Sequence, residues 1–328
     1  MDGSTEIFLT GGTGFVGAQV LRALLDAGYQ VRALVHQHPE RLPALAGCTP
    51  VRGDLAAPGA LARAMAGCRY LVHVAALYSF APRDRARIWE TNVQGCRGLL
   101  EAARIAGVER AVVTSSSSAV GPAVAGRPAT EADRVVHHGG LSAYHGAKIA
   151  EEQVALAAQL PVVLVLPTAP VGPGDWRPTP TGRIVLDFLR GRMVASVKGG
   201  MNVVAVEDVA RAHVLALEQG RPGERYLIGG ENLSFDELWR RLAAVSGRRA
   251  PALHLPHGLV LSLAWGDELR CRLLRATPVI PLEGARMARH YMYASSAKAE
   301  RELGYQPSPV TEALVRAVAW YRDHGYAA

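Results

Sequence analysis

The stretch Thr10-Gly-Gly-Thr-Gly-Phe-Val-Gly17 lies close to the N-terminus and decides the fold of this chain. The apolar run Glu6-Ile-Phe-Leu9 precedes it and predicts a buried strand, and the helically spaced apolar residues of 18–27 follow it. Gly11, Gly14 and Gly17 therefore stand at a strand–turn–helix junction. Such glycines permit a tight turn, a close approach of backbone N–H groups to a pyrophosphate, and close packing of helix on strand. The stretch predicts a dinucleotide-binding site at a helix N-terminus, where the helix dipole favours phosphate. The alternative is a glycine-rich turn that binds no ligand, but the flanking strand and helix favour binding.

Short apolar runs and helical periods alternate through the next 150 residues or so. Strands are expected at 30–35, 49–52, 69–75, 110–114 and 161–166, and helices at 57–66, 85–106 and 142–159. This alternation predicts an α/β fold with a Rossmann-type, doubly wound parallel sheet, whose ligands bind at the carboxyl ends of the strands.

The pattern changes beyond the sixth strand, because prolines, glycines and threonines crowd 167–180. We expect 1–170 to form the dinucleotide-binding domain, with 202–230 returning to it through a strand at 225–228. Segments 171–201 and 231–328 then form a smaller, discontinuous C-terminal substrate-binding domain. In that domain 257–275 predicts an apolar helix, which we interpret as a core helix because charged residues interrupt it and argue against membrane contact.

The composition suits a soluble globular enzyme and disfavours several other classes of protein. Of the 328 residues, 49% are hydrophobic and 20% are charged, and the formal net charge is +7. The basic residues are dispersed, without a basic run interleaved with aromatics, so no nucleic-acid partner is expected. The four cysteines show neither C-x-x-C nor metal-ligand spacing, which indicates free thiols and no metal site. The first residues lack the basic region of a signal peptide, and no apolar stretch reaches the ~18 residues of a membrane span. We therefore expect a cytoplasmic protein.

Tyr144-His-Gly-Ala-Lys148 carries the second signal, within the helix expected at 142–159. A tyrosine and a lysine four residues apart lie on the same face of a helix. A tyrosine hydroxyl titrates near ~10, and an ammonium one turn away lowers that value. The lysine is one of only three in an arginine-rich chain, which favours a role that a guanidinium cannot fill. A surface pair at i, i+4 is the alternative interpretation.

Thr114-Ser115-Ser116-Ser117-Ser118 carries the third signal, because it follows the strand at 110–114. A hydroxyl at this point can hydrogen-bond a substrate oxygen beside the tyrosine. Ser116 is favoured for this role and Ser115 is second, whereas an ordinary polar strand end is the alternative.

Together these motifs resemble the extended short-chain dehydrogenase/reductase superfamily, over nearly the whole chain. Gly53-Asp-Leu55, His73-Val-Ala-Ala76 and Thr91-Asn-Val93 add to the match. Within the superfamily the chain is similar to the NAD-dependent epimerase/dehydratase group, and most of all to dihydroflavonol-reductase-like proteins and hopanoid-associated sugar epimerases. Segments 178–183, 223–232 and 295–305 carry that narrower match. The resemblance implies a nicotinamide cofactor and hydride transfer at a carbinol or ketone carbon, with Ser116, Tyr144 and Lys148 as the catalytic residues.

The motifs and the resemblance together indicate which residues contact the ligands. Cofactor contacts are expected at Gly11, Thr13, Gly14, Phe15, Val16, Gly17, His36, Arg41, Asp54, Leu55, Ala75, Ala76, Asn92, Thr114, Tyr144, Lys148 and Pro167. Substrate contacts are expected at Tyr78, Ser116, Arg183 and Arg289, where an arginine can bind a phosphate through forked hydrogen bonds. A surface ion pair is the alternative for each arginine.

The end of the second strand bears on the choice of cofactor. NAD-specific relatives place an acid there to bind the ribose 2′-OH, but no acid stands at 31–39. Arg32, His36 and His38 stand there instead, with Arg41 close behind, and Arg32 and His36 point to the same side in an ideal strand. We therefore expect NADP or NAD, with a mild preference for NADP that grows as pH falls through the histidine range.

Two enzymatic functions share this machinery. One is a nucleotide-sugar epimerase that retains NAD, and the other is an NADPH-dependent carbonyl reductase of the dihydroflavonol-reductase or aldehyde-reductase type. Dehydration is disfavoured, because Ser117 and Ser118 stand where dehydratases typically carry Asp-Glu. A non-catalytic dinucleotide sensor is the alternative class, although such proteins lose the tyrosine or the lysine. The expected partner is a small molecule, a nucleotide sugar or carbonyl compound, and a homodimer is left open.

Overall fold

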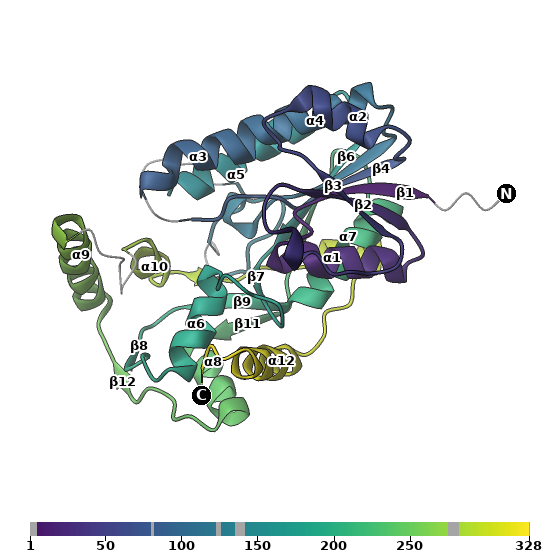
Figure 1. Cartoon of the computed structure of the whole chain (residues 1–328). Helices are drawn as coiled ribbons and strands as arrows, with labels where there is room; N and C mark the ends of the chain where they lie inside the picture. Colours follow the sequence, from purple (N-terminus) through teal and green to yellow (C-terminus); the bar gives the residue numbers. More distant parts are fainter. Residues whose placement is uncertain (1–4, 80–81, 123–125, 135–141, 275–281, 328) are drawn as a thin grey trace.

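The computed structural model describes residues 5–79, 82–122, 126–134, 142–274 and 282–327 (Figure 1). Seven strands form one sheet in the order β10-β6-β5-β4-β1-β2-β3. All neighbouring strands of this sheet are parallel, so the prediction of a Rossmann-type doubly wound sheet is confirmed. The strands are β1 (Glu6–Thr10), β2 (Gln30–Val35), β3 (Cys48–Arg52), β4 (Tyr70–His73), β5 (Arg110–Thr114), β6 (Val162–Pro167) and β10 (Arg225–Ile228).

Helices cover both faces of the large sheet (Figure 1). α1 (Phe15–Asp26), α7 (Val206–Gln219) and α11 (Ala297–Leu303) bury one apolar cluster. α2 (Pro58–Met65), α4 (Gly95–Ile105) and α5 (Ala143–Leu156) bury the other. The strands between them are apolar on both sides, as a parallel sheet covered on both faces requires.

The helix expected at 85–106 is interrupted. α3 (Arg85–Trp89) runs into a π-helical turn at Glu90–Gln94 before α4 begins. The side chain of Asn92 in this turn accepts a hydrogen bond from Leu77 N at 2.7 Å and donates one to Leu77 O at 3.1 Å. The turn thus holds the segment that leaves β4, at the carboxyl edge of the sheet.

A second, smaller sheet lies beside the first and contains β7 (Ala169–Val171), β9 (Gly200–Ala205), β11 (Glu231–Ser234) and β13 (Tyr291–Met292). α6 (Pro180–Leu189), α8 (Phe235–Ser246) and α12 (Val310–Asp323) enclose its core. The stretch 202–230 therefore divides: β9 lies in the second sheet, whereas α7 and β10 belong to the large one. β8 (Ala195–Ser196) pairs with β12 (Leu253–His254) apart from both sheets.

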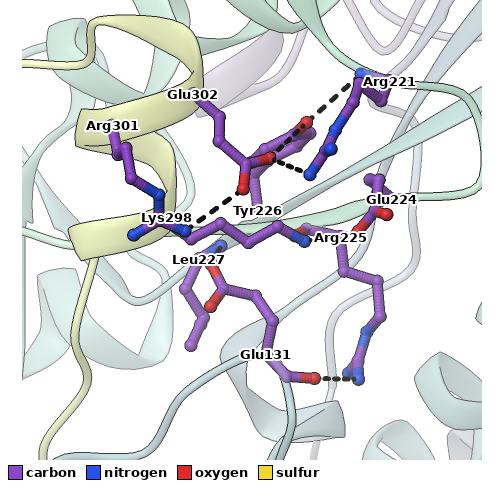
Figure 2. A network of polar contacts seen from close by, with 9 residues as sticks. All are labelled: Glu131, Arg221, Glu224, Arg225, Tyr226, Leu227, Lys298, Arg301 and Glu302. Atoms are coloured by element: carbon purple, nitrogen blue, oxygen red, sulfur yellow. Dashed lines mark hydrogen bonds and ion pairs between the residues drawn. The ribbon is translucent and has the colours of Figure 1, made fainter.

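Strand β10 is an outer strand of the large sheet, and a polar network fastens it there (Figure 2). Glu131 accepts a hydrogen bond from Leu227 N at 2.8 Å, and its carbonyl accepts one from Arg225 at 2.9 Å. From α11, Lys298 donates to the Glu224 carboxylate at 2.6 Å and to Arg225 O at 2.8 Å. Side chains thus supply partners on the side of β10 that faces no further strand.

The interpretation of 257–275 as a core helix is wrong for most of its apolar side chains. α9 (His257–Leu274) buries Ala264 and Cys271, but Leu259, Leu263, Trp265 and Leu269 are between 48% and 59% exposed. The reason is its position, since α9 projects from the body of the molecule and packs against α10 (Leu282–Met287) (Figure 1). Among the described residues, no helix combines the length and the apolar character that crossing a membrane requires.

Candidate active site

The glycine-rich loop between β1 and α1 packs closely against neighbouring backbone. Gly11 has a φ of +80°, and a Cβ on it would lie 2.6 Å from Ala75 N. A Cβ on Gly17 would lie 2.0 Å from Gly11 O, so only glycine fits where α1 meets the loop. Gly14 caps α1 without a side-chain hydrogen bond, which leaves the first N–H groups of the helix available to an anion. These features fit the diphosphate of a dinucleotide.

The end of β4 is fastened against this loop. Thr10 Oγ1 accepts a hydrogen bond from Ala75 N at 3.2 Å and lies 2.7 Å from His73 Nδ1. Burial, with the nearby Lys148 charge adding, lowers the pKa of His73 to about 3, so this imidazole is neutral. Ala75 is therefore brought to the glycine loop, while Ala76 follows it at the surface.

The ends of β2 and β3 meet beside the loop. His36 Nδ1 lies 3.3 Å from Asp54 Oδ2, and both side chains are half exposed. Arg32 does not share this edge, because its guanidinium pairs with Glu6 at 2.5 Å and donates to carbonyls at the end of α2. Arg41 follows at 4.0 Å from the Glu40 carboxylate. The expectation that Arg32 joins His36 is thus wrong, because a strand neighbour and a helix end bind its guanidinium first.

Ser116 and Tyr144 are brought together by a hydrogen bond between their side chains. Ser116 is the second residue after the end of β5, and Tyr144 lies in the first turn of α5, whose N-cap is Ser142. Ser115 faces the other way and donates to Glu152 Oε1 at 2.5 Å in the protein interior. The alternation of side chains along extended backbone separates the two serines.

Lys148 lies one helical turn after Tyr144 and is only 2% exposed. Its ammonium donates to Thr114 O at 2.8 Å and lies 2.8 Å from Glu151 Oε2. The Thr114 hydroxyl is itself 2.7 Å from His213 Nε2 of α7. Thr114 therefore contributes its carbonyl to the lysine.

The electrostatics of this group are dominated by burial. Burial raises the pKa of Tyr144 above its usual value, the Glu151 charge raises it further, and the Ser116 hydrogen bond opposes both. Burial also raises the pKa of Glu151 to about 7, against the attraction of Lys148. Sequence reasoning missed Glu151, although its position three residues after Lys148 places it on the same helix face.

Comparison with known proteins identifies the family. The NAD-dependent epimerase/dehydratase family matches residues 7–229, about two thirds of the chain. The chain belongs to this family.

Two relatives match this chain over nearly its full length. A candidate dihydroflavonol 4-reductase of Synechocystis sp. is 42% identical, covering 97% of this chain and 95% of the relative. Sterol demethylase protein B of Methylococcus capsulatus is 36% identical, covering 97% and 98%. Among solved structures, a nucleoside-diphosphate-sugar epimerase from Pseudomonas aeruginosa superposes with a TM-score of 0.82 at 26% identity, covering 99% of each chain. The chain is thus an enzyme-family member that resembles both reductases and epimerases.

Among the expected substrate contacts other than Ser116, only Tyr78 has a described contact with Tyr144. The Tyr78 ring lies 4.3 Å from the Tyr144 ring, centroid to centroid, and is 41% exposed. Arg183 lies on α6, where it donates to Pro178 O at 3.3 Å, and Arg289 follows α10. Both arginines are exposed, and no described contact joins either to the tyrosine.

The remaining residues expected to contact the cofactor lie at the carboxyl edge of the large sheet or in elements that support it. Asn92 is fully buried, and its side chain hydrogen-bonds Leu77. Leu55 packs against the apolar cluster under α2 and α4, and Pro167 ends β6. Thr13, Phe15 and Val16 belong to the loop and the first turn of α1.

Proposed function

We propose that this chain is an NAD(P)-dependent oxidoreductase that interconverts a ketone and a secondary alcohol on a largely apolar substrate. The observation that carries the proposal is the hydrogen bond between Ser116 and Tyr144 beside the buried Lys148, at the edge of the sheet where the glycine loop lies. A polar trio of this kind can bind a carbonyl oxygen and move one proton to or from it.

The roles of the three side chains follow from their chemistry. Tyr144 donates its proton to the carbonyl oxygen during reduction, and Ser116 hydrogen-bonds the same oxygen. Lys148 stabilises the tyrosinate that remains, since its ammonium is one turn away on the same face of α5. When bound, the nicotinamide supplies the hydride for the carbonyl carbon or accepts it in the reverse direction.

An apolar substrate is favoured over a nucleotide sugar by two observations. The Tyr78 ring, which is tilted against the Tyr144 ring and partly exposed, offers an aromatic wall next to the reacting oxygen. The names of the two relatives above refer to a dihydroflavonol and a sterol, which are polycyclic molecules. The nucleotide-sugar epimerase is the second candidate, supported by the solved epimerase that shares the fold and 26% of the sequence.

We further propose a mild preference for NADP. His36 and Arg41 stand near the end of β2, where no acid of that strand would repel a 2′-phosphate. Asp54, at 3.3 Å from His36, limits the preference. Dissociation constants for NADH and NADPH at pH 6 and pH 8 test it, and tighter NADH binding at both pH values would exclude it.

The test of the function is turnover with a matched pair of substrates. Purified protein is incubated with NADPH or NADH and a panel of flavanonols and keto-steroids, and separately with UDP-sugars. Net cofactor oxidation with the polycyclic ketones, lost in Tyr144→Phe, supports the reductase. Interconversion of UDP-sugars without net cofactor change would replace it with the epimerase. Dinucleotide binding with no turnover of either class in the wild type would indicate the sensor.

A further inference from the structure

One face of α5 carries three ionisable side chains in a row. Tyr144, Lys148 and Glu151 follow each other at spacings of four and three residues, which stack them along the helix. Lys148 is 2% exposed and Glu151 is 1% exposed, and their charged atoms lie 2.8 Å apart. A fully desolvated carboxylate thus meets the lysine that serves the tyrosine.

The groups that face Glu151 from other elements are neutral. His73 Nε2 of β4 lies 4.0 Å from Glu151 Oε1, and burial keeps this imidazole uncharged. Cys96 of α4 belongs to the same cluster. Burial raises the pKa of its thiol, the Glu151 charge raises it further, and the Lys148 and Arg97 charges oppose this rise, so the thiol keeps its proton. Among the described residues, the Lys148 ammonium is the polar group within 3 Å of the Glu151 oxygens.

The neighbouring acid on α5 has a partner of its own. Glu152 lies 3.1 Å from the buried guanidinium of Arg225 on β10 and accepts from Ser115 at 2.5 Å. It is therefore neutralised from the opposite side, at the outer edge of the sheet. Glu151 lies 2.8 Å from the Lys148 ammonium, and burial, with the Glu151 charge adding, raises the pKa of Tyr144.

The physical consequence concerns the proton of Tyr144. An isolated ammonium beside a phenol favours the phenolate, which is a base suited to alcohol oxidation. A carboxylate at 2.8 Å from that ammonium cancels much of its field, and the cancellation is strong because the pair is away from water. The phenol then keeps its proton and remains an acid.

We propose that Glu151 is a positioning residue that holds the Lys148 ammonium and screens its charge, so that Tyr144 stays protonated and can act as an acid toward a carbonyl oxygen. This acid role rests on the proposed function, whereas the protonation of Tyr144 is measured without substrate.

The test is an NMR titration of protein labelled with ¹³C at the tyrosine ζ carbons. The Tyr144 signal is assigned by its loss in Tyr144→Phe and followed from pH 7 to pH 10.5, with and without NADP⁺. Three proteins are compared: wild type, Glu151→Gln, which removes the charge at equal size, and Glu151→Asp, which keeps the charge on a shorter side chain. We expect Tyr144 of the Gln variant to begin to ionise below pH 10.5, whereas Tyr144 of the wild type and of the Asp variant stays protonated over this range.

Two results would overturn the proposal. One is an identical Tyr144 titration in all three proteins, including no ionisation in any of them up to pH 10.5. The other is an equal shift in the Gln and Asp variants, which would mark a packing effect. Should Glu151→Gln fail to fold, Glu151→Ala takes its place in the same comparison. If no ketone is turned over but the titration shifts as expected, the proposed function fails and the role of Glu151 in setting the protonation of Tyr144 stands.

Discussion

Gly17→Ala should destabilise the protein and weaken dinucleotide binding, although alanine is the better helix former. A Cβ at this position would lie 2.0 Å from Gly11 O and 2.5 Å from Gly11 C, whereas ordinary contact begins at 3.4 Å. The first turn of α1 must therefore retreat from the loop by more than an ångström. Overpacking typically costs about 1–3 kcal/mol, and a clash with backbone belongs at the upper end. The helix propensity of alanine returns at most ~1 kcal/mol, so the net loss is about 2 kcal/mol.

The assay is urea and thermal unfolding with and without NADPH, together with fluorescence titration of NADPH. A loss of about 2 kcal/mol corresponds to a fall in Tm of roughly 3 °C in a chain of this size. We expect the NADPH affinity to fall at least about tenfold, or ~1.4 kcal/mol, because the N–H groups at the start of α1 move with the helix. Gly59→Ala is the matched control: it lies in the first turn of α2, and its Cβ would meet nothing within 4 Å. If Gly17→Ala behaves like Gly59→Ala in both measurements, the reasoning about the loop is refuted.

Three further substitutions test the site. Tyr144→Phe should lower turnover at least ~100-fold in steady-state kinetics with little change in Tm, and near-normal turnover would place the proton donor elsewhere. Ser116→Ala should lower turnover. Ser115→Ala should instead lower the free energy of unfolding in urea by about 1–3 kcal/mol, because Glu152 loses its hydrogen-bond donor at 2.5 Å. The reverse pattern would exchange the roles of the two serines. His36→Arg should tighten NADPH binding relative to NADH, since a guanidinium can fork onto a phosphate, and an unchanged ratio of dissociation constants would count against the assignment of this edge.

The large sheet could be predicted from the sequence because its signals are local. A strand, three glycines and a helix within 22 residues sufficed for β1, the loop and α1, and the same alternation continued to β6. The π-helical turn at Glu90–Gln94 left no such signal, since its residues fit an α-helix equally well. The exposure of α9 could not be predicted either, because the sequence of an apolar helix has the same pattern whether or not other elements cover it.

The sequence indicated candidate residues for the site but not their pairings. Ser116, Tyr144 and Lys148 were predicted from motif and helix spacing, and in the structure Ser116 hydrogen-bonds Tyr144. The pairs formed by His36 with Asp54 and by Arg32 with Glu6 join segments far apart in the chain, so no local pattern indicates them. Such pairings decide which charges remain available to a ligand.

The place of β10 in the sheet has a consequence for synthesis of the protein on the ribosome. Strand β6 ends at Pro167, but the strand that pairs with its outer edge begins only at Arg225. The intervening stretch of about 60 residues takes roughly 3 to 12 s to translate at ~5–20 residues per second. Throughout that interval the edge of β6 has no neighbour and Glu152 has no guanidinium, so the nascent sheet offers an open strand edge to other chains and to chaperones.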